Sequence, residues 1–128
     1  MNLEKVVFGF FVTLAATLNF GFFIGDISNS TLHNEYELFA AVVVNLIATV
    51  LKFGDRTQIG AVHLATSLVA DLQLIAATVF WAFAAHVSSA GLTDSATASI
   101  VSLSGGALVA NVVSLVLLVV ETSSFRRN

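Results

Sequence analysis

The sequence has no cysteine and no proline, and only 10% of its residues are charged. The absence of cysteine excludes disulfide bonds and thiolate metal sites. The absence of proline removes a common cause of kinks in long helices. Soluble domains carry about 25% charged residues, so the low charge excludes an ordinary soluble protein. Together with 57% hydrophobic residues and a mean hydropathy of +0.94, it predicts an integral membrane protein.

Apolar segments occupy most of the 128 residues. Each is close to the length of about 20 residues that crosses about 30 Å of hydrocarbon as a helix. They cover residues 6–25, 36–53, 59–87 and 98–120. We therefore predict one all-α domain over residues 1–128, an integral membrane bundle of four transmembrane helices arranged as two hairpins.

Basic residues flank the apolar segments on one predicted side of the membrane and are absent from residues 26–35 and 88–97. In chain order they are Lys5, Lys52, Arg56, Arg126 and Arg127. Basic residues in short loops stay on the cytoplasmic side of a membrane. We therefore predict a multi-pass protein of the cell inner (plasma) membrane with both termini in the cytoplasm.

The opposite side is predicted to carry an acidic rim. Its members are Asp26, Glu35, Glu37 and Asp94. Two interpretations stay open, because these side chains either solvate ordinary loops or concentrate cations by their field. Tyr36 and Trp81 lie at the same predicted interface, where aromatic side chains commonly anchor spanning helices.

Asp71 lies near the middle of the third apolar segment. An aspartate at the centre of a spanning helix costs about 2.5 to 3.5 kcal/mol on insertion scales, so it usually faces a bundle interior or a watery cavity. Three states are compatible with the sequence. Asp71 is ionised against Lys52 or Arg56, or is protonated and hydrogen bonded to Asn45 or Asn111, or binds a permeating cation.

Neutral polar residues recur at helical spacing around this position. Besides Asp71, we assign the ion path or binding site to Asn45, Asn111, Ser67 and Thr78. The alternative interpretation is helix packing, since such side chains hydrogen bond across membrane helices for about 0.6 kcal/mol each. His63 follows the same stripe as Ser67 and Asp71 and is a candidate proton sensor, although a histidine near the interface is commonly just solvated.

Enzyme and cofactor signatures are missing from the sequence. It has no glycine-rich phosphate loop, nucleophile elbow or potassium-channel filter, and its three histidines never form a close pair. We expect no enzyme activity, no cofactor and no fixed metal site. The net charge of −3 gives no reason to expect a nucleic-acid partner.

The stretch Val50-Leu51-Lys52-Phe53-Gly54-Asp55-Arg56-Thr57-Gln58-Ile59-Gly60, followed by Ala70-Asp71-Leu72-Gln73, resembles a family of small four-span bacterial inner-membrane proteins without a known activity. The resemblance covers most of the chain. It implies a bacterial membrane setting and implies nothing about chemistry.

These observations favour a membrane transport protein, an oligomeric cation channel or carrier with an intramembrane carboxylate. The alternative is a structural or accessory subunit of a larger membrane complex. The expected partners are the lipid bilayer, further copies of the chain and, for the alternative, the larger complex. A single four-helix bundle leaves little room for a hydrated path, which is the reason for expecting self-association.

Overall fold

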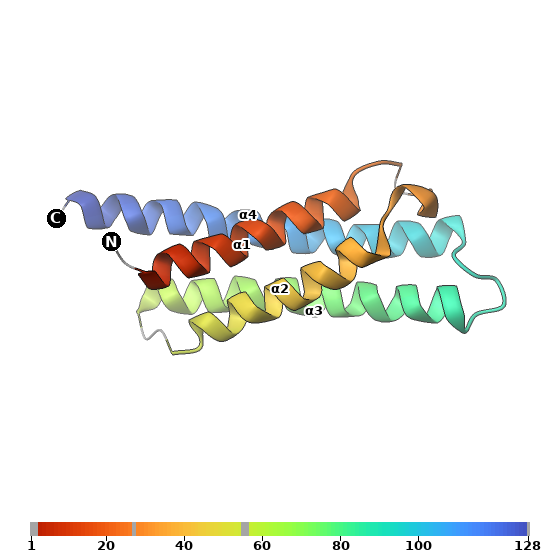
Figure 1. The fold of residues 1–128 in the computed structure, drawn as a ribbon, viewed down its shortest axis with the longest axis horizontal. Coiled ribbons are helices and arrows are strands. Elements are labelled where there is room, and N and C mark those ends of the chain that lie inside the picture. Colours follow the sequence, from red (N-terminus) through yellow and green to blue (C-terminus); the bar gives the residue numbers. More distant parts are fainter. Residues whose placement is uncertain (1–2, 27, 55–56, 128) are drawn as a thin grey trace.

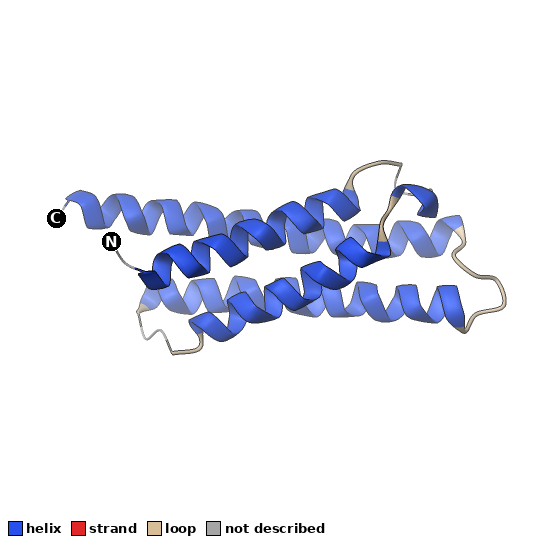
Figure 2. Cartoon of the chain, in the orientation of Figure 1, coloured by secondary structure: helices blue, strands red, loops and turns tan. Residues whose placement is uncertain are grey.

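The structure is a computed structural model, which describes residues 3–26, 28–54 and 57–127. The described residues form α1 (Leu3–Phe23), the short 3-10 helix η1 (Ser30–Leu32), α2 (Glu35–Lys52), α3 (Gln58–His86) and α4 (Asp94–Arg127). No strand occurs in these ranges, which confirms the all-α prediction. The helices run alternately up and down, and the two termini lie at the same end (Figures 1 and 2).

The helices begin where the sequence provides capping side chains. The Asn34 side chain accepts a hydrogen bond from the Tyr36 N–H at 2.8 Å and starts α2. Thr57 accepts one from the Gly60 N–H at 3.0 Å and starts α3. Such caps satisfy backbone donors that have no partner within the helix. The four predicted segments therefore correspond to four helices, with α4 longer than expected at both ends.

Each helix packs against two neighbours. The main contacts join α1 with α2 and α4, and α3 with α2 and α4, so the four helices surround one interior. We call the end with the termini and the α2–α3 connection the terminal end, and the end with the other two connections the loop end. A large apolar cluster containing Phe22, Leu38, Leu74 and Trp81 is distinct from a smaller one around Phe8.

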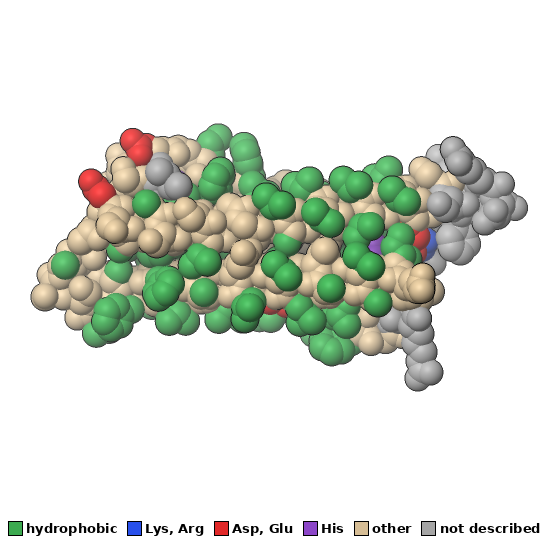
Figure 3. Space-filling model, turned by 180° about the vertical axis from the view of Figure 1, so that it is seen from behind, with side chains coloured by type: hydrophobic (Ala, Val, Ile, Leu, Met, Phe, Trp, Pro, Cys, Tyr) green, Lys and Arg blue, Asp and Glu red, His purple; other side chains and the backbone are tan. Residues whose placement is uncertain are grey.

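The distribution of polarity is inverted relative to a soluble bundle. Asp71 is 6% exposed, whereas its neighbour Leu72 is 74% exposed. Hydrophobic side chains cover the surface along the length of the bundle in the view of Figure 3. Soluble helices turn their apolar stripe to the core and their charges to water. An apolar exterior around an interior that also holds polar side chains suits a lipid environment.

By length and composition, three of the described helices are able to cross a membrane: α1, α3 and α4 over Asp94–Ser123. The second helix is 18 residues long and includes Glu35, Glu37 and Lys52, so charged residues form a larger share of it than of α1, α3 or α4. Arg56, on which part of the predicted orientation rests, lies outside the described residues.

The prediction that Trp81 anchors the bundle at a lipid interface is wrong. Its side chain is buried, packs edge-on against Phe22 with ring centroids 5.7 Å apart, and donates its indole N–H to Glu35 at 2.9 Å. Burial in the core gives the large ring many contacts while the carboxylate satisfies its polar end. Tyr36, in contrast, is exposed.

Candidate functional site

Asp71 occupies the middle of α3, 13 residues after Gln58 and 15 before His86 (71 − 58 and 86 − 71). Its carboxylate faces the bundle interior. The Thr49 hydroxyl of α2 lies 2.5 Å from Oδ2. The other oxygen, Oδ1, is buried and has no hydrogen-bond partner. The site is therefore a buried carboxyl group, halfway along an apolar helix, with one neutral partner and one unpartnered oxygen.

The inward direction of Asp71 follows from the spacing of α3. Residues four apart lie on one helical face, and His63, Ser67 and Asp71 are all buried, as the stripe predicts. Beyond Asp71 the same face continues with Leu74 and becomes apolar. Thr78 is only partly buried, although its hydroxyl oxygen is enclosed and has no hydrogen-bond partner.

The helices α2 and α4 contribute the other predicted side chains. Asn45 and Asn111 are both buried. The Asn45 side chain donates to the carbonyl of Ala41 at 2.8 Å, while the Asn111 Nδ2 is buried without a partner. Neither amide bonds to Asp71. The predicted residues thus share one interior, but the direct contact is made by Thr49, which lies four residues after Asn45 on α2 and was not among the predicted site residues.

Lys52, the basic residue of α2, does not form the ion pair with Asp71 that the sequence left open. Lys52 lies with its Nζ 4.3 Å from the centre of the Phe8 ring, and Asp71 has no ion pair within 4.0 Å among the described residues. The alkyl stem of a buried lysine packs on apolar surface, and its ammonium is attracted by an aromatic face. Arg56 lies outside the described residues.

A cluster of charged groups closes the terminal end of the interior. Lys5 Nζ lies 3.0 Å from Glu121 Oε1, and His63 Nε2 lies 3.6 Å from Glu121 Oε2. The His63 ring packs edge-on against Phe8, with centroids 5.0 Å apart. His63 is fully buried, so the expectation of a solvated interfacial histidine is wrong. Glu121, 58 residues further along the chain, gave no local sequence signal for this contact.

The predicted acidic rim is divided between two environments. Asp26 and Asp94 are exposed, whereas Glu35 and Glu37 are partly buried. Glu35 is engaged by the indole of Trp81. At Asp26, the backbone N–H of Ser28 and then its hydroxyl, both 3.0 Å from Oδ1, hold the pKa below its usual value of 3.8. The exposed part of the rim is therefore smaller than the sequence suggested.

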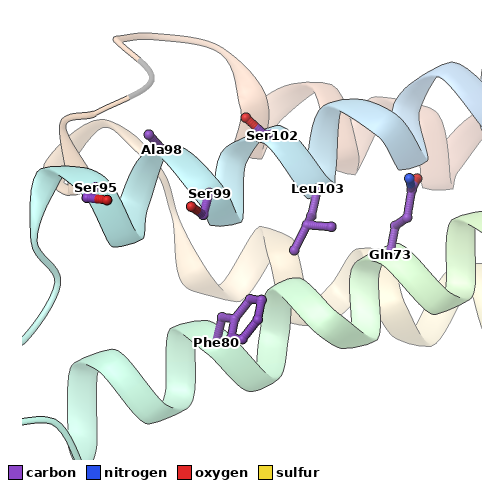
Figure 4. Close-up of a pocket in the computed structure, with 7 residues that line it drawn as sticks. All are labelled: Gln73, Phe80, Ser95, Ala98, Ser99, Ser102 and Leu103. Atoms are coloured by element: carbon purple, nitrogen blue, oxygen red, sulfur yellow. The ribbon is translucent and has the colours of Figure 1, made fainter.

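An open groove lies between α3 and α4 on the bundle surface, with a volume of about 580 Å³ (Figure 4). Its floor and sides combine Phe80 and Leu103 with polar groups. The polar lining consists of Gln73, Ser95, Ser99 and Ser102. The three serines belong to α4 and are exposed, so hydroxyl groups line a surface that is otherwise apolar.

Comparisons with known proteins give a family and no activity. A model described as "Family of unknown function (DUF6394)" matches residues 32–122, which is more than half of the chain. No curated protein and no solved structure gives a significant match.

Proposed function

The chain belongs to this family of unknown function, and from its own geometry we propose that it is a membrane transport protein, a cation channel or carrier with Asp71 as the intramembrane binding group. In this proposal all four helices cross the plasma membrane, the termini face the cytoplasm, and the protein self-associates. The sequence resemblance to bacterial inner-membrane proteins gives the proposed setting.

The observation that carries the proposal is the buried carboxyl group of Asp71. It has one hydroxyl partner and an oxygen left unpartnered halfway along an apolar helix. A purely structural hydrogen bond is available from asparagine without the cost of an ionisable group. Ionisable residues at this depth commonly mark ion pathways and proton relays.

The proposal that α2 also crosses the membrane rests on where its charges lie. Glu35 and Glu37 are in its first turn and Lys52 is its last residue, so residues 38–51 contain no charge. Eighteen helical residues extend about 27 Å at 1.5 Å each. The helix packs beside α1 and α3, both of which have the length and composition of spans.

We propose self-association because a single four-helix bundle leaves little room for a hydrated path. Asp71 faces the interior of its own chain, and its partner Thr49 belongs to the same chain. Each copy thus contains a complete carboxyl site, and association brings complete sites together instead of building one between copies.

The test is ion flux through purified full-length protein in liposomes, with potassium, sodium, calcium and proton gradients imposed in turn. We expect flux of at least one cation in wild type and its loss in Asp71→Asn, which keeps the volume and removes the charge. Thr17→Val is the matched control, because the exposed Thr17 hydroxyl bonds only to a carbonyl of its own helix. Unchanged flux in Asp71→Asn would contradict the mechanism.

The groove between α3 and α4 supports a second candidate, an accessory subunit of a larger membrane complex. Its exposed serines lie on an apolar surface, where small polar residues favour helix association. In mild detergent, such a subunit would copurify with a larger complex. Ser99→Leu, which fills the groove, should then release the complex, whereas Ser89→Leu in the α3–α4 connection should not.

A further inference from the structure

The contacts of Thr49 limit where protons lie at the Asp71 site. The Thr49 Oγ1 is 2.5 Å from Asp71 Oδ2 and 2.9 Å from the backbone carbonyl oxygen of Asn45. A hydroxyl carries one proton, and a carbonyl oxygen only accepts. If Thr49 donates to Asn45, its contact with Asp71 is a hydrogen bond only when the carboxyl group itself donates. Both contacts are therefore satisfied together by a protonated Asp71.

The rest of the surroundings favour the same state. A carboxylate would leave the charged Oδ1 buried without a hydrogen bond, whereas a carboxylic acid leaves only a neutral acceptor there. The charged groups that close this half of the interior are Lys5 of α1, Lys52 of α2 and Glu121 of α4, and none pairs with Asp71. Within the described residues, no three His, Cys, Asp or Glu side chains form a metal-binding group.

On the face of α3 that carries Asp71, the other polar side chains lie on one side of it. Towards the terminal end, Ser67 and His63 follow at intervals of four residues, or about 6 Å along the axis, a separation short enough for one bridging water to span. Glu121 then lies beside His63 and connects to the partly exposed Lys5.

Towards the loop end, Leu74 and Trp81 of α3 join the apolar cluster from the other three helices. Asn19 and Ser104 also lie in that direction, where Ser104 donates to the Asn19 Oδ1 at 2.8 Å, but the apolar side chains of this cluster separate them from Asp71 along α3. Along α3, the polar side chains thus lead from the terminal end to Asp71 and then give way to Leu74 and Trp81.

From this arrangement we propose that the cation taken up by Asp71 is the proton, and that it exchanges with the terminal side of the membrane through His63 and Ser67. This rests on the proposed transport function. On loading, the His63 imidazolium gives up its ring N–H proton and becomes neutral imidazole. The proton passes through the Ser67 hydroxyl to the Asp71 carboxylate, which becomes a neutral acid, and His63 regains a proton from the terminal-side solution.

Thr49 is the positioning residue of this scheme. When Asp71 is protonated, the acid donates to Thr49 Oγ1 and Thr49 donates to Asn45. When Asp71 loses its proton, the Thr49 hydroxyl turns and donates to the carboxylate. One rotation of the Thr49 hydroxyl thus keeps a hydrogen bond between Thr49 and Asp71 in both protonation states.

Infrared difference spectroscopy of full-length protein in liposomes at neutral pH tests the protonation. We expect the carbonyl band of a carboxylic acid in wild type and its loss in Asp71→Asn. Thr49→Val should shift the band to higher frequency, Thr49→Ser should restore it, and Thr17→Val should leave it unchanged. A carboxylate signature for Asp71, or a band insensitive to Thr49→Val, would overturn the assignment.

Proton uptake from a pH gradient tests the route in the same liposomes. We expect loss of uptake in Asp71→Asn and a decrease of about 100-fold in His63→Gln, the lower end of what a positioned proton donor contributes. Ser67→Ala should also decrease proton uptake, but by less than His63→Gln. Proton uptake at the wild-type rate in both His63→Gln and Ser67→Ala would overturn the route.

The combined outcomes separate the two proposals. Asp71-dependent sodium or potassium flux without proton uptake would overturn the proton inference and leave the transport function standing. An acid band with no flux of any ion would overturn transport and the proposed exchange route, and support only the proton assignment at Asp71.

Discussion

The buried imidazole of His33 contacts one backbone carbonyl in the last turn of α1 and one in the connection that follows it. Its Nδ1 lies 2.5 Å from the Phe22 oxygen and its Nε2 lies 2.8 Å from the Asp26 oxygen. Carbonyls only accept, so both contacts are hydrogen bonds only when both ring nitrogens carry protons. The ring also packs against the Phe22 ring, which ties the connection to the apolar cluster.

Replacing His33 should therefore loosen the loop end. We expect His33→Ala to lower the free energy of unfolding by about 1 to 3 kcal/mol, because it removes the imidazole contact from the buried Phe22 carbonyl, whereas the Asp26 carbonyl keeps the Asn29 N–H. His86→Ala is the control, since His86 is exposed at the end of α3. Thermal unfolding in detergent compares the two, and equal melting temperatures would contradict the role assigned to His33.

Asp26 adds a pH-dependent contact in the same connection. Its pKa is lowered from 3.8, chiefly by the Ser28 backbone N–H, then by the Ser28 hydroxyl and, to a smaller extent, by the charge of His33. A lowered folded-state pKa means that the ionised carboxylate stabilises the turn above pH 3.8 and that this contribution is lost as pH falls through the lowered value. The Ser28 amide resonance should titrate with a midpoint below 3.8, and a midpoint at or above 3.8 would contradict the contact. Ser28→Ala should move the midpoint of the Asp26 carboxyl upwards.

Single residues also show what the sequence was able to predict about the site. The cost of burying a charge made Asp71 recognisable without a structure, and helical spacing placed Ser67 and His63 on its face. Thr49 was not assigned to the site because the register between two helices depends on their crossing and side-chain packing, which a single sequence does not give. The contact between His63 and Glu121 was missed for the same reason.

At the scale of helices, length and apolar content predicted the number of helices and most of their ends. The inward faces were harder to predict, since every span is apolar over most of its circumference. Trp81 illustrates the difficulty, because an aromatic residue near a predicted interface is compatible with a lipid anchor or with a core position. Its neighbours Phe22 and Glu35 come from two other helical segments and decide the matter.

Close packing between α1 and α4 depends on Gly105. A Cβ atom at this position would lie 2.7 Å from Cε1 of the Phe23 ring, so Gly105→Ala requires the ring or the helices to move. We expect a loss of about 1 to 3 kcal/mol, the usual cost of overpacking. Gly54→Ala is the control, because a Cβ there meets nothing within 4 Å. Unfolding in detergent measures both, and an equally stable Gly105→Ala would show that Phe23 yields without cost.

For the whole molecule, the path of the chain across the membrane depends on α2. If α2 crosses and the N-terminus is cytoplasmic as proposed, the connection containing Gly54 and the end of α4 near Ser123 both lie on the cytoplasmic side, and Ser89 lies on the other side. If α2 does not cross, α3 and α4 each reverse direction relative to α1, and all three positions change sides. The antiparallel packing of α2 against α1 and α3 favours the first arrangement.

The absence of native cysteine makes this prediction directly testable. We expect Gly54→Cys and Ser123→Cys to react with a membrane-impermeant maleimide in inside-out vesicles, and Ser89→Cys to react in right-side-out cells. All three positions are exposed at the surface of the bundle, so a failure to react reports the membrane barrier instead of burial in the fold. The reverse pattern at all three positions would overturn the proposed orientation, because either an α2 that does not cross or an inverted four-helix bundle produces it. The sidedness of the route through His63 would then have to be assigned to the opposite face.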